Sequence, residues 1–242
     1  MKVLSILIVS ILFAACSLFV VETPLVNFVK TYAYTDTSGS FYKKKVLKFV
    51  KDEMVSRVVL SATEKGKALE KTTAVSKLKV IDSNTTIVLP KVAEHKVWFN
   101  EKLYYSKIEA DTKEKNYKVY LKSPEKKWNG VKEYKVPKSK KICWFSQLPE
   151  CLKLLGLLDY NRQKKEFYVA WDSFPYHTEQ LLGISDKELF SRATINFDSD
   201  YDQFKRFEVI INDSSLFYFY DAKKEFKRYF WISQGISLID KD

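Results

Sequence analysis

The sequence predicts a mainly β protein built on a curved antiparallel sheet, a half-barrel or open barrel, with one or two short mid-chain helices. Segments rich in β-branched and aromatic residues recur along the chain: 15% of its 242 residues are aromatic, whereas Gly and Pro number six each. Turn-forming residues separate these segments at short intervals, as in a meander. A twisted sheet of ten or more strands tends to curl, so we expect the helices to cover its concave face.

The N-terminal segment Met1–Val21 is an apolar run, typical of an export signal or membrane anchor. Phe13–Cys16 fits a lipobox that would make Cys16 the lipidated first residue. Cleavage beside Cys16 could instead free a soluble protein beginning at Leu18. Alternatively, Val3–Val21 could stay uncut and span the bilayer, since its helix would cover about 28 Å. The lipid-anchored form is the leading prediction, with the rest of the chain exported to the periplasm or outer cell envelope.

Residues 22–242 are predicted to form a single β-rich domain, because no fixed-period repeat or long linker divides them. Tyr117, Val119 and Leu121 alternate with polar positions, which is the pattern of a half-buried strand. The predicted strands are Phe28–Thr35, Phe41–Val50, Met54–Ala62, Leu69–Ile81, Thr85–Leu89, Lys96–Phe99, Leu103–Glu109, Tyr117–Lys122, Glu166–Ala170, Phe204–Ile211, Leu216–Tyr220, Phe226–Ile232 and Ile236–Ile239.

Two short helices are predicted between these groups of strands. Pro149–Leu158 has leucines at helical spacing, and its proline is tolerated in a first turn. Ser185–Glu188 fits a capping box that would open a helix to about Arg192.

Two cysteines remain once Cys16 is assigned to the N-terminal signal. Cys143 and Cys151 lie eight residues apart in an exported chain, which favours a disulfide. The alternatives are two unpaired buried thiols or, with less support from the spacing, a redox-active pair.

The layout of the chain resembles the bacterial periplasmic half-barrels of the lipoprotein-carrier and lipoprotein-receptor type, and the uncharacterised exported lipoproteins built like them. The resemblance rests on the export signal, the Trp98–Tyr105 strand–turn–strand segment and the mid-chain helices. It implies a concave cavity that holds an acyl chain or another hydrophobic ligand. No functional residue can be carried over from these families, because the resemblance includes no diagnostic motif.

The most site-like stretch is Trp171–His177, which follows a predicted strand and combines three aromatic residues with an acid and a histidine. A second apolar stretch follows Cys143 and could close over a hydrophobic cavity. Aromatic packing under a loop explains the first stretch equally well, and a core helix held by a disulfide is the favoured explanation of the second. The residues predicted to bind the ligand are Trp144, Phe145, Trp171, Phe174 and Tyr176.

Charge and motifs narrow the class of function. The net charge is +11, and only five of the 41 basic residues are Arg. In an exported chain with few arginines, this positive charge argues against nucleic-acid binding. It favours a solvated or membrane-facing surface instead. Hydrolase, kinase and zinc-protease motifs are missing from the sequence, no cofactor or metal is predicted, and His95 and His177 are interpreted as surface or turn residues.

The sequence therefore predicts a non-enzymatic, lipid-anchored envelope protein that binds an apolar or amphiphilic ligand. A structural or protein-interaction lipoprotein without a cavity is the alternative. A second alternative is a hydrolase-like enzyme centred on Asp172 and His177. The sequence assigns no oligomeric state.

Overall fold

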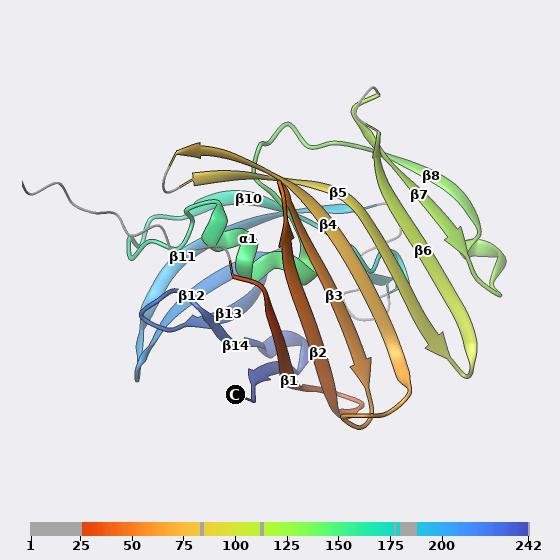
Figure 1. Cartoon of the computed structure of the whole chain (residues 1–242), viewed down its shortest axis with the longest axis horizontal. Coiled ribbons are helices and arrows are strands. Elements are labelled where there is room, and N and C mark those ends of the chain that lie inside the picture. The colour runs from red at the N-terminus through yellow and green to blue at the C-terminus, as the bar shows by residue number, and fades with distance from the viewer. Residues whose placement is uncertain (1–25, 83–84, 112–113, 177, 180–187, 242) are drawn as a thin grey trace, which may run out of the picture.

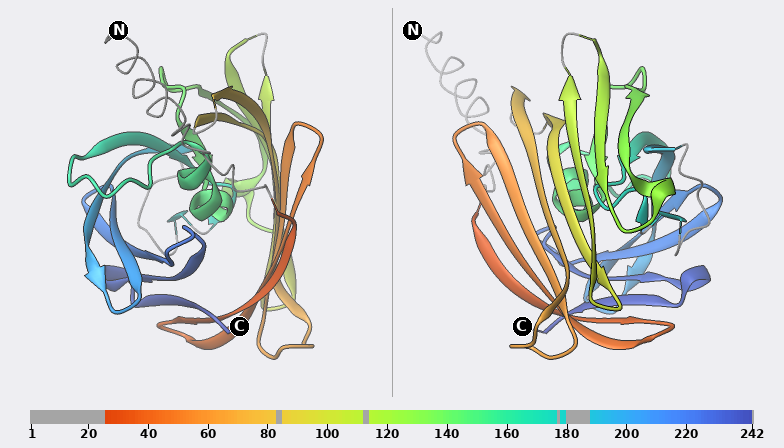
Figure 2. Two further views of the ribbon diagram at one scale, coloured as in Figure 1. Left: turned by 60° about the vertical axis from the view of Figure 1, so that its left-hand side comes forward. Right: turned by 90° about the vertical axis from the view of Figure 1, so that its right-hand side faces the viewer.

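The computed structural model describes residues 26–82, 85–111, 114–176, 178–179 and 188–241. Their strands form a single 15-stranded sheet in the order β8-β7-β6-β5-β4-β3-β2-β1-β15-β14-β13-β12-β11-β10-β9. The sheet curls so that its two halves face each other, with a short helix between them (Figures 1 and 2). The predicted fold class, a curved open barrel with mid-chain helical structure, is confirmed.

Neighbouring strands pair in an antiparallel manner except for β9 and β10, which are parallel. The N-terminal half begins beside the last strand, since β1 pairs with both β2 and β15. The strands are β1 Phe28–Asp36, β2 Gly39–Val50, β3 Glu53–Ser61, β4 Ala68–Asp82, β5 Thr85–Phe99, β6 Lys102–Asp111, β7 Asn116–Lys122, β8 Gly130–Lys135, β9 Ile142–Trp144, β10 Lys165–Ala170, β11 Phe190–Tyr201, β12 Phe204–Ile211, β13 Ser214–Tyr220, β14 Phe226–Trp231 and β15 Ile236–Asp240.

Two-residue turns account for the tight connections in the meander. Asn100 and Glu101 join β5 to β6 with φ values of 47° and 63°, and Asn212 and Asp213 join β12 to β13 with 46° and 63°. Positive φ at both central residues is the hairpin geometry whose twist matches the flanking strands. The predicted strand–turn–strand at Trp98–Tyr105 is therefore confirmed.

Strand β5 is longer than predicted, because the segments Thr85–Leu89 and Lys96–Phe99 join into one strand. Pro90 lies between them, opposite a register shift in β4 at Val75 and Ser76. Proline has no N–H for the ladder, and a bulge is one of the few places in a sheet that tolerates it.

The second predicted helix is partly wrong. Residues 185–187 lie outside the described part of the chain, but Ser191 and Arg192 belong to β11 and pair with Val169 and Tyr168 of β10. Pairing along a neighbouring strand overrides the local capping signal, and the alternating burial of Ser191, Ala193 and Ile195 fits a strand.

The helical segment inside the sheet consists of η2 (Phe145–Gln147) and α1 (Leu148–Leu154), here called the plug. Helix α1 ends four residues earlier than predicted, because Gly156 adopts a left-handed φ of 65° and terminates it. Leu157 and Leu158 nevertheless remain buried. Cys143 of β9 and Cys151 of α1 form the predicted disulfide, with 5.9 Å between their Cα atoms.

Two further short 3-10 helices are η1 (Lys126–Trp128) and η3 (Ile232–Gln234). Among the described residues, no helix combines the length and the apolar composition needed to cross a membrane.

Candidate functional site

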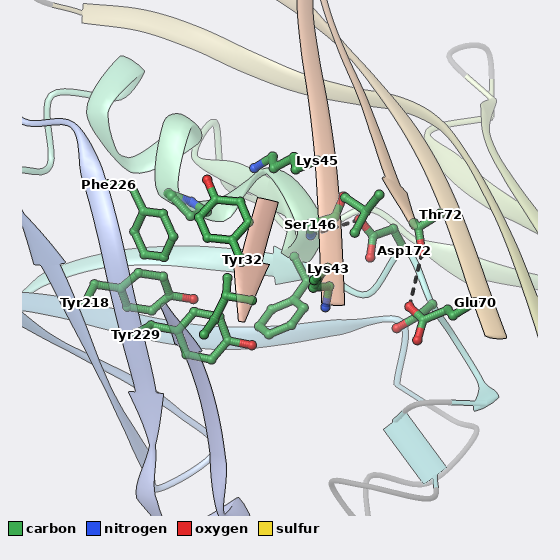
Figure 3. Close-up of a pocket in the computed structure, with 15 residues that line it drawn as sticks. Tyr32, Lys43, Lys45, Glu70, Thr72, Ser146, Asp172, Tyr218, Phe226 and Tyr229 are labelled. Carbon is green, nitrogen blue, oxygen red and sulfur yellow. Dashed lines mark hydrogen bonds between the residues drawn. The ribbon is translucent and has the colours of Figure 1, made fainter. Parts of the chain in front are cut away.

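A small cavity lies on the concave side of the sheet, near the middle of the strand order, where β1 meets β15 and the plug covers both. Its volume is about 70 Å³. Strands β1–β4 and β13–β15 contribute its walls, and the plug and the segment after β10 close it (Figure 3). The lining residues are Tyr32, Lys43, Lys45, Val58, Glu70, Thr72, Phe145, Ser146, Pro149, Asp172, Ser173, Tyr218, Phe226, Tyr229 and Leu238.

One side of the cavity is aromatic. Phe226 packs 5.9 Å from the rings of both Tyr32 and Tyr218, and the Tyr218 and Tyr229 rings are 5.4 Å apart. Burial raises the pKa of the Tyr218 and Tyr229 hydroxyls, so both stay protonated at neutral pH. This wall therefore presents ring surface together with neutral hydroxyl groups.

Two lysines from β2 point into the barrel. Lys43, Lys45 and Leu47 alternate with outward residues, so their side chains face the concave side. The Nζ atom of Lys45 lies 2.6 Å from Oε2 of Glu150 on α1, and both side chains are largely buried. The interpretation of the basic residues as a solvated or membrane-facing surface is therefore wrong for Lys45, because the strand alternation turns it inward.

Asp172 is 2% exposed and closes the opposite side of the cavity. Its Oδ2 atom accepts a 2.9 Å hydrogen bond from the backbone N–H of Ser146. Burial raises the pKa of Asp172 above its ordinary value of 3.8; the Ser146 hydrogen bonds and the charge of Lys43 act in the opposite direction. In the view of Figure 3, Lys43 lies between Asp172 and the aromatic wall.

A polar cluster behind Asp172 joins β4 to β5. Thr72 Oγ1 lies 3.0 Å from Nδ1 of His95, and Oε1 of Glu70 lies 3.9 Å from the same nitrogen. His95 is fully buried, so its interpretation as a surface or turn residue is wrong. It occupies an inward position in the middle of β5 and packs against the ring of Tyr176, 6.3 Å away.

Of the five residues predicted to bind a ligand, Phe145 lines the cavity. Trp144, Trp171, Phe174 and Tyr176 do not belong to its lining and are packed in the core with at most 1% exposure. The predicted segment after β10 does reach the cavity, but through Asp172 and Ser173 rather than through its aromatic residues. His177 lies outside the described residues.

Sequence reasoning missed most of the lining, because it comes from seven strands that are far apart in the chain. One signal was available: Lys43, Lys45 and Leu47 share a parity within a predicted strand, which places both lysines on the face of a core leucine. The sequence held no comparable signal to separate the lining tyrosines Tyr32, Tyr218 and Tyr229 from the other tyrosines among the 15 in the chain.

The cavity combines an aromatic wall, tyrosine hydroxyls, two lysines and two carboxyl groups. Its lining is therefore mixed, with apolar ring surface on one side and charged groups on the other. No group of three or more potential metal ligands gathers within the described ranges.

The fold and this cavity define an open antiparallel β-barrel closed by a helical plug. No family model and no curated protein matches the chain. Among solved structures, it is similar to a β-barrel-like protein of the domain of unknown function DUF1849 from Brucella abortus, at 10% sequence identity. The similarity covers 89% of this chain and 96% of the other, with a TM-score of 0.45.

Proposed function

We propose that this chain is an exported, non-enzymatic envelope protein, anchored to a membrane through a lipidated Cys16, that binds the small polar head of an amphiphilic ligand. The observation that carries the proposal is the mixed lining of the concave cavity. Aromatic rings on one side and charged groups on the other suit a molecule that has both apolar and polar surface.

The volume of the cavity limits the size of the ligand group that it can enclose. Pockets that enclose drug-sized ligands have volumes of about 300–1,000 Å³, whereas this cavity has about 70 Å³. A head group of a few heavy atoms fits that volume, but an acyl chain does not. The hydrophobic ligand implied by the half-barrel resemblance would therefore have to place its chain outside the described cavity.

The charges of the lining favour a neutral or zwitterionic head group. Lys43 would repel a cation, and Glu70 would repel an anion. Lys45 is already paired with Glu150, so its charge is compensated within the protein. A head group that carries both signs can satisfy Lys43 and the carboxyl groups together.

The proposed location rests on two features. Met1–Val21 has the composition of an export signal that ends near a lipobox cysteine. The Cys143–Cys151 disulfide is typical of proteins in oxidising compartments.

The proposal is tested with the full chain by calorimetric titration with two soluble probes. Glycerophosphoethanolamine is a zwitterionic head group without acyl chains, and glycerol phosphate is its anionic counterpart. We expect the zwitterion to bind more tightly. Asp172→Asn removes a lining charge but keeps an oxygen for the Ser146 N–H, and we expect it to weaken zwitterion binding about tenfold, as loss of one charge-assisted contact does.

Asp198→Asn is the matched control, because Asp198 pairs with Arg206 on the outer face of the sheet. It should leave binding unchanged. Equal affinity for both probes, or equal loss in the two variants, would show that the cavity does not recognise the head group.

A further inference from the structure

A row of lysines crosses the outer face of the N-terminal half of the sheet. The pairing registers place Lys44 opposite Val59, Val59 opposite Lys71, and Lys71 directly opposite Lys96. Lys96 is opposite Tyr105, which is opposite Lys122. One line across β2–β7 therefore carries four lysines, here called the lysine row (Lys44, Lys71, Lys96 and Lys122).

The lysine row points away from the core. Its members alternate with buried residues of the same strands, and all are exposed except Lys96, which is half-buried. Aromatic rings lie beside two of them: Lys71 Nζ is 5.9 Å from the Trp98 ring centroid and Lys96 Nζ is 5.6 Å from that of Tyr105. Arg57 is exposed on the same face, one row away. This face looks away from the plug (Figure 2, right).

The positive charges of the lysine row are not neutralised by neighbouring acidic residues. Like charges that face each other across a strand pair destabilise the sheet, and Lys71 and Lys96 are such a pair. No member of the row, and not Arg57, forms an ion pair within the described part of the chain. Glu94 lies on this face as well, but it is opposite Lys107 in the β5–β6 register.

Several other outward basic residues of the sheet lie beside acids. In the N-terminal half, Lys107 lies 2.6 Å from Glu109. In the C-terminal half, Arg192 pairs with Glu166, and Arg206 lies 2.5 Å from Asp198. Lys205 likewise lies 2.5 Å from Asp200. The uncompensated row is therefore a local feature and does not follow from the lysine-rich composition alone.

We propose that the outer face of β2–β7 docks on the head groups of an anionic phospholipid membrane through the lysine row and Arg57. Lysine ammonium groups attract an anionic bilayer surface, and aromatic side chains such as Trp98 and Tyr105 favour the head-group level. The lysine row crosses six strands of this face, which gives an extended membrane surface a continuous line of positive charge to contact.

The start of the described chain supports this occupant. Val29 of β1 is opposite Val46, and Val46 is opposite Arg57. The first strand of the sheet therefore begins in the same cross-strand row as Arg57, beside the basic face. The roughly ten residues from Cys16 to Val26 reach at most about 35 Å. This inference rests on the proposed membrane attachment, which would hold the face near the bilayer.

The test uses the full chain reconstituted into two kinds of vesicle, neutral phosphatidylcholine alone and phosphatidylcholine with anionic phosphatidylglycerol. An amine-reactive reagent labels exposed lysines, and mass spectrometry reads the labelling at each site. We expect the lysine row to be protected in anionic vesicles and labelled in neutral ones, with protection lost at high salt because screening weakens the attraction. Lys138, Lys140 and Lys164 are exposed outside this face and should be labelled equally in both.

The variant K44Q/K71Q/K96Q removes three charges, and its control K138Q/K140Q/K164Q removes three elsewhere. Each lysine near an anionic surface contributes about a fivefold factor, so we expect the first variant to weaken docking roughly 100-fold and to expose Lys122 to labelling. The control should keep Lys122 protected.

The outcomes separate the two proposals. A chain that fails to associate with neutral vesicles contradicts the proposed anchor. A chain that associates with both vesicles but shows no selective protection of the lysine row overturns the docking face. Protection by soluble DNA and not by anionic vesicles also overturns it.

Discussion

Ser76 Oγ on β4 donates a 2.6 Å hydrogen bond to Oε1 of Gln147 in the plug. The Nε2 group of Gln147 donates in turn to the backbone carbonyls of Ala74 and Met54, at 2.9 and 3.2 Å. One fully buried side chain thus joins the plug to two strands of the N-terminal half. The plug forms the roof of the cavity, so these bonds also hold the site together.

Gln147→Ala should lower the free energy of unfolding by about 2–4 kcal/mol, because it leaves a buried hydroxyl and two carbonyls without this partner. Urea denaturation measures the change. Gln203→Ala is the control, since Gln203 is exposed in the β11–β12 turn and should change stability by less than about 0.5 kcal/mol. Equal effects of the two substitutions would contradict the role of Gln147.

The disulfide should stabilise the fold by constraining the unfolded chain. Closing a loop between residues eight positions apart contributes about 2.6 kcal/mol in the chain-entropy model. The double variant Cys143→Ala/Cys151→Ala should lose about that much in chemical denaturation, plus the packing of two buried sulfur atoms. A loss below about 1 kcal/mol would show that the loop is already ordered in the unfolded state.

The Lys45–Glu150 pair should show strong energetic coupling. Lys45→Met leaves a buried carboxylate without its partner and should destabilise the protein by about 3 kcal/mol. The double variant Lys45→Met/Glu150→Leu should recover most of that loss, because removal of both charges leaves neither one unpaired. A double-mutant cycle measures the coupling. Additive effects would mean that the two charges do not interact.

Asp172 should make the protein less stable as pH rises. Burial raises the pKa of its carboxyl group in the folded state above the ordinary 3.8, so the folded state binds its proton more tightly than the unfolded state does. Stability from this group is present below pH 3.8 and is lost as pH rises through the folded pKa. Asp172→Asn should therefore gain stability relative to the wild type over that window, and unfolding curves across pH measure the difference. A difference that does not change with pH would contradict this assignment.

The N-terminus should carry a lipid on Cys16. Mass spectrometry of the protein from its native membranes should detect a diacylated peptide that starts at Cys16, and Cys16→Ala should abolish it. An N-terminus at Leu18 would instead indicate a cleaved soluble form, and an intact Met1 an uncut anchor.

Local sequence patterns were sufficient to predict most strands of the sheet. Tyr117, Val119 and Leu121 are all buried, as their alternation predicted. Strands β8, β9 and β11 were missed. Strand β8 is an edge strand without a buried face. Strand β9 is too short to show a period, and the start of β11 follows a local helix-capping signal. Their strand conformation depends on pairing with β10, which is a long-range contact.

The candidate site was predicted only in part. Phe145 and the segment that contains Asp172 were identified from aromatic clustering, but Trp171 and Phe174 of that same segment are core residues. Aromatic clusters have the same composition in a core and at a ligand site, so sequence cannot separate the two. The ion pair of Lys45 with Glu150 could not be predicted from the sequence either, since the two residues are 105 positions apart.

The sequence by itself determined the β-rich class and the positions of most strands and turns, and it favoured the cysteine pairing, because these depend on periodicity and short spacing. The alternation along β2 placed Lys43 and Lys45 on the core face, but only the tertiary structure decided that a cavity forms there and which distant side chains meet in it. Sheet curvature brings β1–β4, β13–β15 and the plug together, and curvature is the sum of small twists over fifteen strands that no local window contains. The lysine row likewise became visible only once the register aligned six strands.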